Sequence, residues 1–241
     1  MKNKYFGDIR DLFKYDLIEC IMRGIYSLHG FTFIPMLTKD EDGKRDGNKR
    51  DFDKAKENCR PGTRNKNLMG FLNDNADKRN FIVMEEYFKS VGIRPFIYDG
   101  HNDKYFTNDC RDEYFKKIPK KSLDYSLVFV DPDIGLQIKR NSEKHLLRDE
   151  VRGLYMRMNE NSILMIYQHF PRENHEKYLI NRSRELKEKI TKNLPPIYIS
   201  DNEIILFLVT RTSLMRNNLV KIITKYKECY KNYEKLIVEI K

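Results

Sequence analysis

The sequence predicts an α/β domain with a doubly wound, mostly parallel sheet that ends in an antiparallel hairpin. Short apolar runs without polar interruption recur along the chain, as at 126–131 and 162–168. Stretches with apolar residues at three- and four-residue steps separate these runs and indicate amphipathic helices. Strands that are apolar on both faces and alternate with such helices are typical of a parallel sheet covered on both sides. Two final runs at 197–210, divided by Asp201-Asn202, add the hairpin.

The predicted elements follow one another in a regular order. Residues 8–26 predict a helix, because their apolar side chains recur on one helical face. Residues 31–37 are short and apolar and predict a strand, and the polar residues 38–54, with two glycines, predict a loop. We expect the next three strands to be parallel neighbours in the sheet. The remaining elements are a mostly helical stretch at 66–90, strands at 93–99, 126–131 and 162–168, helices at 108–118, 146–158 and 172–191, and a long helix from residue 214.

Length and composition predict one domain over residues 1–241. Within it, residues 38–66 form a loop insertion rich in both charges, and residues 211–241 a basic C-terminal helix. With 40% hydrophobic and 34% charged residues, the chain is not disordered as a whole. It has no apolar run of the ~18–20 residues that span a bilayer, so we expect no membrane partner. The four cysteines are far apart without a C-x-x-C pair, which is typical of reduced thiols and predicts a cytoplasmic protein.

The formal net charge of +10 comes from two segments. Residues 44–66 hold nine Lys/Arg against four Asp/Glu, and residues 211–241 hold eight against three. Clusters of this kind on an otherwise neutral chain are typical of surfaces that bind polyanions, which predicts nucleic acid as a partner. The alternative is that these Lys and Arg side chains lie on solvent-exposed surfaces and bind no partner. The residues that we expect to contact nucleic acid are Lys44, Arg45, Lys49, Arg50, Arg60, Arg64 and Arg172.

Polar residues follow four successive predicted strands, at the edge of the sheet where ligands bind in such folds. Asp131 and Asp133 come directly after the apolar run at 126–131, and His169 follows the run at 162–168. We expect Asp131, Asp133 and His169 to be catalytic residues. The alternatives are that Asp131 caps a turn and that neighbouring backbone groups satisfy His169.

Three motifs together resemble a family of uncharacterised microbial proteins that brings no established activity. Residues 4–15 read K-Y-F-G-D-x-x-D-x-x-K-Y, residues 131–136 read D-P-D-x-G-L, and residues 167–172 read Y-Q-H-F-P-R. The pattern covers residues 4–172 of the chain.

More loosely, the D-P-D-x-G-L motif with the strand before it and the terminal hairpin resembles class I S-adenosylmethionine-dependent methyltransferases, in particular the three-Cys-motif partner group. The resemblance implies a Rossmann-like fold in which Asp131, Pro132 and Asp133 face the methyl acceptor. Two departures stand out, because residues 35–40 replace the G-x-G turn of those enzymes and the sequence shows one strand fewer than their seven. The resemblance places S-adenosylmethionine against Asp99 and the loop residues Asp42, Gly43, Asp46 and Gly47.

Three functions remain open from the sequence. The first is a nucleic-acid methyltransferase in which a target amine approaches Asp131 and positioning supplies most of the catalysis. The second is a nuclease or phosphoesterase in which Asp131, Asp133 and loop carboxylates hold Mg²⁺. The third is a non-catalytic protein that binds nucleic acid or a partner protein through its basic segments. The chain lacks the G-x-x-x-x-G-K-[ST] motif, which excludes P-loop ATPases.

Overall fold

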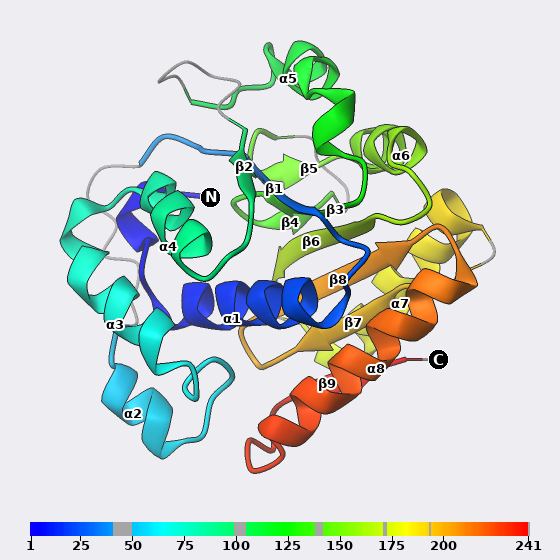
Figure 1. The fold of residues 1–241 in the computed structure, drawn as a ribbon. Helices are drawn as coiled ribbons and strands as arrows, with labels where there is room; N and C mark the ends of the chain where they lie inside the picture. The colour runs from blue at the N-terminus through cyan, green and yellow to red at the C-terminus, as the bar shows by residue number, and fades with distance from the viewer. Residues whose placement is uncertain (41–49, 99–104, 138–141, 171–172, 193, 241) are drawn as a thin grey trace.

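The computed structural model describes residues 1–40, 50–98, 105–137, 142–170, 173–192 and 194–240, which form a sheet between two layers of helices (Figure 1). The main sheet contains β1 (Gly30–Pro35), β2 (Pro95–Ile97), β3 (Ser126–Asp131), β6 (Ile163–His169), β7 (Ile197–Ser200), β8 (Ile204–Thr210) and β9 (Ile237–Glu239). A separate pair consists of β4 (Gly135–Leu136) and β5 (His145–Leu146). The helices are α1 (Ile9–Gly24), α2 (Phe52–Glu57), α3 (Lys66–Asn75), α4 (Met84–Ser90), α5 (Arg111–Lys117), α6 (Arg148–Arg157), α7 (His175–Leu186) and α8 (Ser213–Cys229).

The strand order of the main sheet is β2-β1-β3-β6-β8-β7-β9. The first four strands are parallel, whereas β8 lies antiparallel between β6 and β7, and β9 pairs antiparallel with β7 at the edge. The predicted mostly parallel α/β sheet with a terminal antiparallel hairpin is therefore confirmed.

Side chains of the central strands alternate between two hydrophobic clusters, one on each face of the sheet. Phe129 and Met165 pack into the cluster that contains residues of α1, α3, α4 and α8. Val130 and Ile166 pack into the cluster that contains residues of α5, α6 and α7. All six residues of β3 are buried, as a strand covered on both faces requires. Figure 1 shows α1 and α8 crossing the same face of the sheet.

Three sequence predictions differ from the structure. The strands β2, β3 and β6 are parallel, but β1 lies between β2 and β3, so these two are not neighbours. The loop predicted at 38–54 already contains the first residues of α2, which begins where the Asp51 carboxylate accepts a hydrogen bond from the Lys54 N–H. The segment 211–241 is not one helix, because α8 ends at Cys229 and the chain returns to the sheet as β9. In the described part of the chain, no helix is both long and apolar enough to cross a bilayer.

Candidate active site

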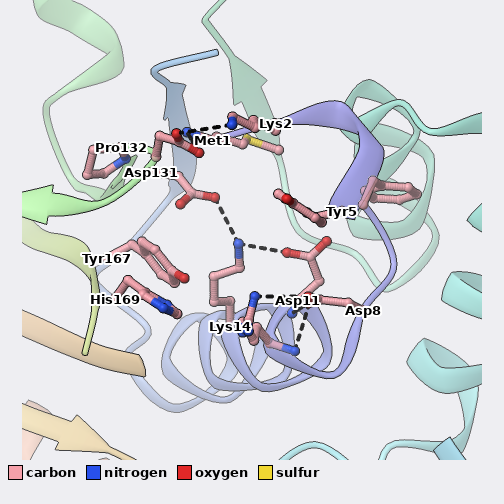
Figure 2. A pocket seen from close by; sticks show the side chains of 13 residues that line it. Met1, Lys2, Tyr5, Asp8, Asp11, Lys14, Asp131, Pro132, Tyr167 and His169 are labelled. Atoms are coloured by element: carbon pink, nitrogen blue, oxygen red, sulfur yellow. Dashed lines mark hydrogen bonds and ion pairs between the residues drawn. The ribbon is translucent and has the colours of Figure 1, made fainter. Parts of the chain in front are cut away.

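Between β1 and β3, the order in which successive strands are added to the sheet reverses. From β1 the chain crosses to β2 on one side, whereas β3 pairs with the other side of β1. Ligands of open α/β sheets bind at such a switch point, outside the carboxyl ends of the strands. A cavity of about 280 Å³ lies there (Figure 2). Its walls are residues from the first part of the chain up to Lys14, the Asp131–Asp133 turn after β3, and Tyr167 and His169 of β6.

A buried lysine on α1 binds two carboxylates in this cavity. The Lys14 ammonium donates to Asp131 Oδ2 at 2.8 Å and lies 2.7 Å from Asp11 Oδ1. The same ammonium lies 4.9 Å from the centre of the Tyr167 ring. Figure 2 shows Lys14 reaching from α1 to the end of β3. The chain therefore supplies its own cation to a carboxylate that ends a fully buried strand.

Burial and charge act in opposite directions on this group of residues. Burial alone would lower the pKa of Lys14, but the carboxylates of Asp11 and Asp131 raise it well above its ordinary value. Burial raises the pKa of Asp131, and the neighbouring Lys14 opposes that shift. Lys14 is therefore held as a cation whose partners are two nearly inaccessible carboxyl groups.

Asp8 begins α1 and also faces the cavity. Its Oδ1 accepts hydrogen bonds from the backbone N–H groups of Arg10 and Asp11, at 2.9 and 3.0 Å, and so caps the helix. Its Oδ2 is buried without a hydrogen bond from any described residue and lies 3.6 Å from the Arg10 guanidinium. Burial, together with the Asp11 carboxylate, raises the pKa of Asp8 to about 7. With a pKa of about 7, Asp8 changes its charge near neutral pH.

Asp133 and His169 complete the wall. The Asp133 carboxylate lies 3.9 Å from the Lys2 ammonium, at the distance limit of an ion pair. The His169 backbone N–H donates to the Ile134 carbonyl at 2.7 Å, which fixes the end of β6 against the turn after β3.

The side chain of Gln168 joins the turn after β3 to β6. Its Oε1 accepts a hydrogen bond from the Leu136 N–H at 2.7 Å, and its Nε2 donates to the carbonyls of Ile134 and His169. The residue between the two bonded positions, Gly135, has a φ of +136°, and a Cβ there would come within 2.3 Å of the Gln168 amide. The glycine of the D-P-D-x-G-L motif is therefore required by the glutamine of the Y-Q-H-F-P-R motif.

We expect Gly135→Ala to lower the free energy of unfolding by about 1–3 kcal/mol, because the new methyl group clashes with Gln168 in a backbone conformation that alanine resists. Gly153→Ala is the matched control, since it lies in α6 with no atom within 4 Å of the added Cβ. The control should gain about 0.5–1 kcal/mol from helix propensity. Urea denaturation measures both values, and an unaltered stability for Gly135→Ala would show that Gln168 is not held as described.

The structure brings the three predicted catalytic residues, Asp131, Asp133 and His169, to one cavity. The predicted cofactor residues Asp99, Asp42, Gly43, Asp46 and Gly47 lie outside the described residues. The sequence analysis missed Lys14, Asp11 and Asp8. A signal for them was present in the first motif, where acidic, acidic and basic residues recur at three-residue steps and thus share one face of a helix.

The predicted nucleic-acid contacts divide into three groups. Lys44, Arg45, Lys49 and Arg172 lie outside the described residues. Arg50 and Arg60 have structural partners: Arg50 donates to the carbonyls of Phe6 and Ala76, and Arg60 binds acidic residues of the β7–β8 turn. Arg64 is exposed, with its guanidinium 5.9 Å from the centre of the Tyr230 ring.

Asp131 and Asp133 each lie beside a lysine. Lys14 contacts the first and Lys2 the second, so a positively charged side chain already faces each carboxylate. Across the described ranges, no group of three or more His, Cys, Asp or Glu side chains is arranged to hold a metal ion. A Mg²⁺ site built on both aspartates would require these lysines to move.

Comparisons with known proteins give little further information. No family model matches the chain, and no curated protein matches it. Among solved structures, the chain is similar to the crystal structure of protein LPL1258 from Legionella pneumophila, assigned to the family model DUF519. The sequence identity is 10% and the TM-score 0.44, with 97% of this chain and 96% of the other covered. This likeness is too distant to bear on function.

Proposed function

We propose that the chain is an S-adenosylmethionine-dependent methyltransferase that acts on an amino group of nucleic acid. The observation that carries the proposal is the position of Asp131-Pro132-Asp133, at the carboxyl end of β3 and beside the switch point of the sheet. The strand order supports it as well, because the antiparallel β8 lies between β6 and β7, as the terminal hairpin of a methyltransferase-like sheet would. Over the residues that the structure describes, the main sheet has seven strands, one more than the sequence analysis counted, because β9 adds an edge strand. Because a fold hosts many functions, the proposal depends on the chemistry of the site.

The cavity has charges of both signs, which suit a zwitterionic cofactor. S-adenosylmethionine carries an ammonium, a carboxylate and a sulfonium. Among the described residues, the unbonded Oδ2 of Asp8 and the carboxylate of Asp133 could receive the ammonium, and Lys2 could receive the carboxylate. A ligand with charged groups of only one sign would leave the side chains of the other sign in this lining without a partner. The residues present therefore fit the group.

Each side chain has a distinct part in the proposed reaction. When bound, S-adenosylmethionine would supply a methyl group on a positively charged sulfur. As the target nitrogen forms its bond to this methyl group, the methyl–sulfur bond would break, S-adenosylhomocysteine would leave, and one amine proton would pass to solvent. The Lys14 ammonium donates a hydrogen bond to Oδ2 of Asp131 and so fixes this carboxylate. No described side chain bonds to Oδ1, so this oxygen is left to accept a hydrogen bond from an N–H of the target amine. Since Lys14, which Asp11 also binds, holds this carboxylate before substrate arrives, the amine is oriented without reorganisation of the site.

Isothermal titration calorimetry separates this proposal from its rivals. We expect the wild-type protein to bind S-adenosylmethionine and not Mg²⁺ alone, because lysines already face both aspartates. Binding of Mg²⁺ without S-adenosylmethionine would favour a nuclease, and binding of neither would favour a non-catalytic protein. Either result would contradict methyl transfer.

Asp131→Asn tests the role of the carboxylate. It keeps the shape of the side chain and removes the charge that orients the amine, so we expect transfer of labelled methyl groups to a mixed nucleic-acid pool to fall about 10²-fold or more. Cofactor affinity should change little, because Asp131 contacts the acceptor. The control Asp124→Asn removes a carboxylate paired with Lys120 on the surface and should leave transfer unaltered. Full activity of Asp131→Asn would exclude it as the orienting group.

A further inference from the structure

The two basic segments of the sequence meet at a second cavity. This cavity has a volume of about 730 Å³ and lies between α2 and the turn that follows α8. Residues from 50 to 60 form one wall and residues from 232 to 235 the other. Residues of both basic segments therefore line one groove, which we call the basic groove.

Arginine contacts hold the two walls together. The Arg60 guanidinium lies 5.8 Å from the centre of the Tyr233 ring and also binds Asp201 and Glu203, at 2.7 and 2.9 Å. Arg64 packs similarly on Tyr230 at 5.9 Å. Because the Arg60 guanidinium is held by two carboxylates and a ring, it fixes the two walls relative to each other. Arg60 thus has a structural part in the groove, whereas the exposed lysines of the groove are left for a ligand.

Lys54 and Lys235 line the groove from its opposite walls, and both are exposed. Lys56, Lys66 and Lys231 are exposed on the neighbouring surface of the same segments. The groove also contains Asp51 and Glu234, but the Asp51 carboxylate caps α2, where the helix dipole compensates its charge. The lining holds the basic residues Arg50, Lys54, Arg60 and Lys235 against the acidic residues Asp51 and Glu234, so its net charge is positive, as binding of a phosphate backbone requires.

The basic groove adjoins the candidate active site at the first turn of α1. Ile9 lines the groove, whereas its neighbours Asp8 and Arg10 line the active-site cavity. A chain of ion pairs crosses between them, because Glu203 binds Arg60 through Oε1 and Arg10 through Oε2. A polymer in the groove would thus pass within one helical turn of the site.

We propose that the basic groove binds the sugar-phosphate backbone of a single-stranded nucleic acid and leads one of its bases into the cavity beside Asp131. This inference rests on the proposed function for the identity of the substrate. The ligand is recognised by its phosphates, so the groove itself contributes affinity and position, and the cavity selects the base. A groove built from lysine side chains predicts binding that weakens steeply as the salt concentration rises.

The test compares two charge-reversal variants of the full chain, Lys54→Glu/Lys235→Glu in the groove and Lys116→Glu/Lys121→Glu as control. The control lysines are exposed on α5 and the turn after it, in the opposite helical layer, so both variants change the net charge equally. Fluorescence anisotropy measures the binding of short labelled single-stranded DNA and RNA over a series of salt concentrations. We expect the groove variant to bind on the order of tenfold more weakly, with a salt slope shallower by about 0.7 for each phosphate that the groove no longer neutralises.

The outcomes separate this inference from the proposed function. Equal weakening in both variants, or wild-type binding by the groove variant, overturns the groove assignment. The groove assignment is also overturned if the wild-type protein binds neither oligonucleotide. If that protein still binds S-adenosylmethionine, methyl transfer stays possible, with an amine other than one of nucleic acid as its substrate. Loss of oligonucleotide binding in the groove variant alone supports the groove, even if S-adenosylmethionine does not bind and the proposed reaction fails.

Discussion

Lys14→Met should lower the free energy of unfolding by about 3–5 kcal/mol at neutral pH, the cost of leaving buried charges without their partner. The ammonium lies between Asp11 and Asp131 at 2.7 and 2.8 Å, and all three side chains are buried. Methionine fills a similar volume, so the loss reports on charge and little on packing. Urea denaturation followed by circular dichroism measures the difference. The control Lys117→Met breaks an exposed pair with Glu113 and should scarcely alter stability.

A second substitution distinguishes the loss of charge compensation from a general failure to fold. Asp131→Asn added to Lys14→Met removes one of the two uncompensated carboxylates, so the double variant should recover a large part of the lost stability. The single variant should also become more stable as the pH is lowered, because protonation neutralises the same groups. If the double variant is no more stable than the single one, Lys14 does not act through Asp131.

The parts of the fold that the sequence predicted best are those buried on both faces. β3, β6 and β8 are almost entirely buried and therefore appear in the sequence as runs of apolar residues. The hairpin of β7 and β8 was recognisable because Asp201 marks its turn, where the side chain accepts hydrogen bonds from the Glu203 and Ile204 N–H groups.

Other elements left no such signal. β4 and β5 have two residues each. Gln168 holds β4 through the Leu136 N–H, and the Arg111 guanidinium holds β5 through the His145 carbonyl, so distant side chains decide this pair. β9 is three residues long and only partly buried at the sheet edge, so its sequence cannot be distinguished from a helix end. Tyr226 in α8 and Tyr230 directly after it are buried, and their hydroxyls donate hydrogen bonds to the Asp16 carboxylate. The spacing of the tyrosines in the sequence does not specify this partner, because Asp16 lies on the distant helix α1.

The sequence predicted the residues that the strands contribute to the candidate site and missed those that α1 contributes. Residues that follow strands are drawn together by the geometry of a parallel sheet, which is why Asp131, Asp133 and His169 were found. Lys14 lies on a helix that precedes β1, and helical periodicity alone assigns a lysine to the solvent face. Its burial depends on carboxylates from two other positions, and such pairing appears only in three dimensions.

The second large effect expected is on the pH dependence of stability, through Asp8. Burial and the neighbouring Asp11 raise the pKa of this carboxyl from 3.8 to about 7, so between these values the folded protein binds a proton that the unfolded chain has released. Stability must therefore fall as the pH rises from about 4 to about 7, and the Asp8 contribution to this fall is about 2–4 kcal/mol.

Asp8→Asn should remove this fall, because asparagine also caps helices but carries no charge to bury. We expect the variant to match the wild-type protein near pH 4 and to exceed its free energy of unfolding by about 2–4 kcal/mol near pH 8, as measured by urea denaturation at each pH. Asp51→Asn is the matched control, since Asp51 caps α2 in the same way with an exposed side chain, and it should leave the pH profile unchanged. A variant that kept the wild-type pH profile would show that the carboxyl group beside the Asp131 cavity is ionised throughout this range. In that case the cavity would present a fixed negative charge to its ligand at neutral pH. The affinity for a cationic ligand would then stay constant between pH 6 and pH 8, whereas deprotonation of an Asp8 with a pKa of about 7 predicts that this affinity increases with pH.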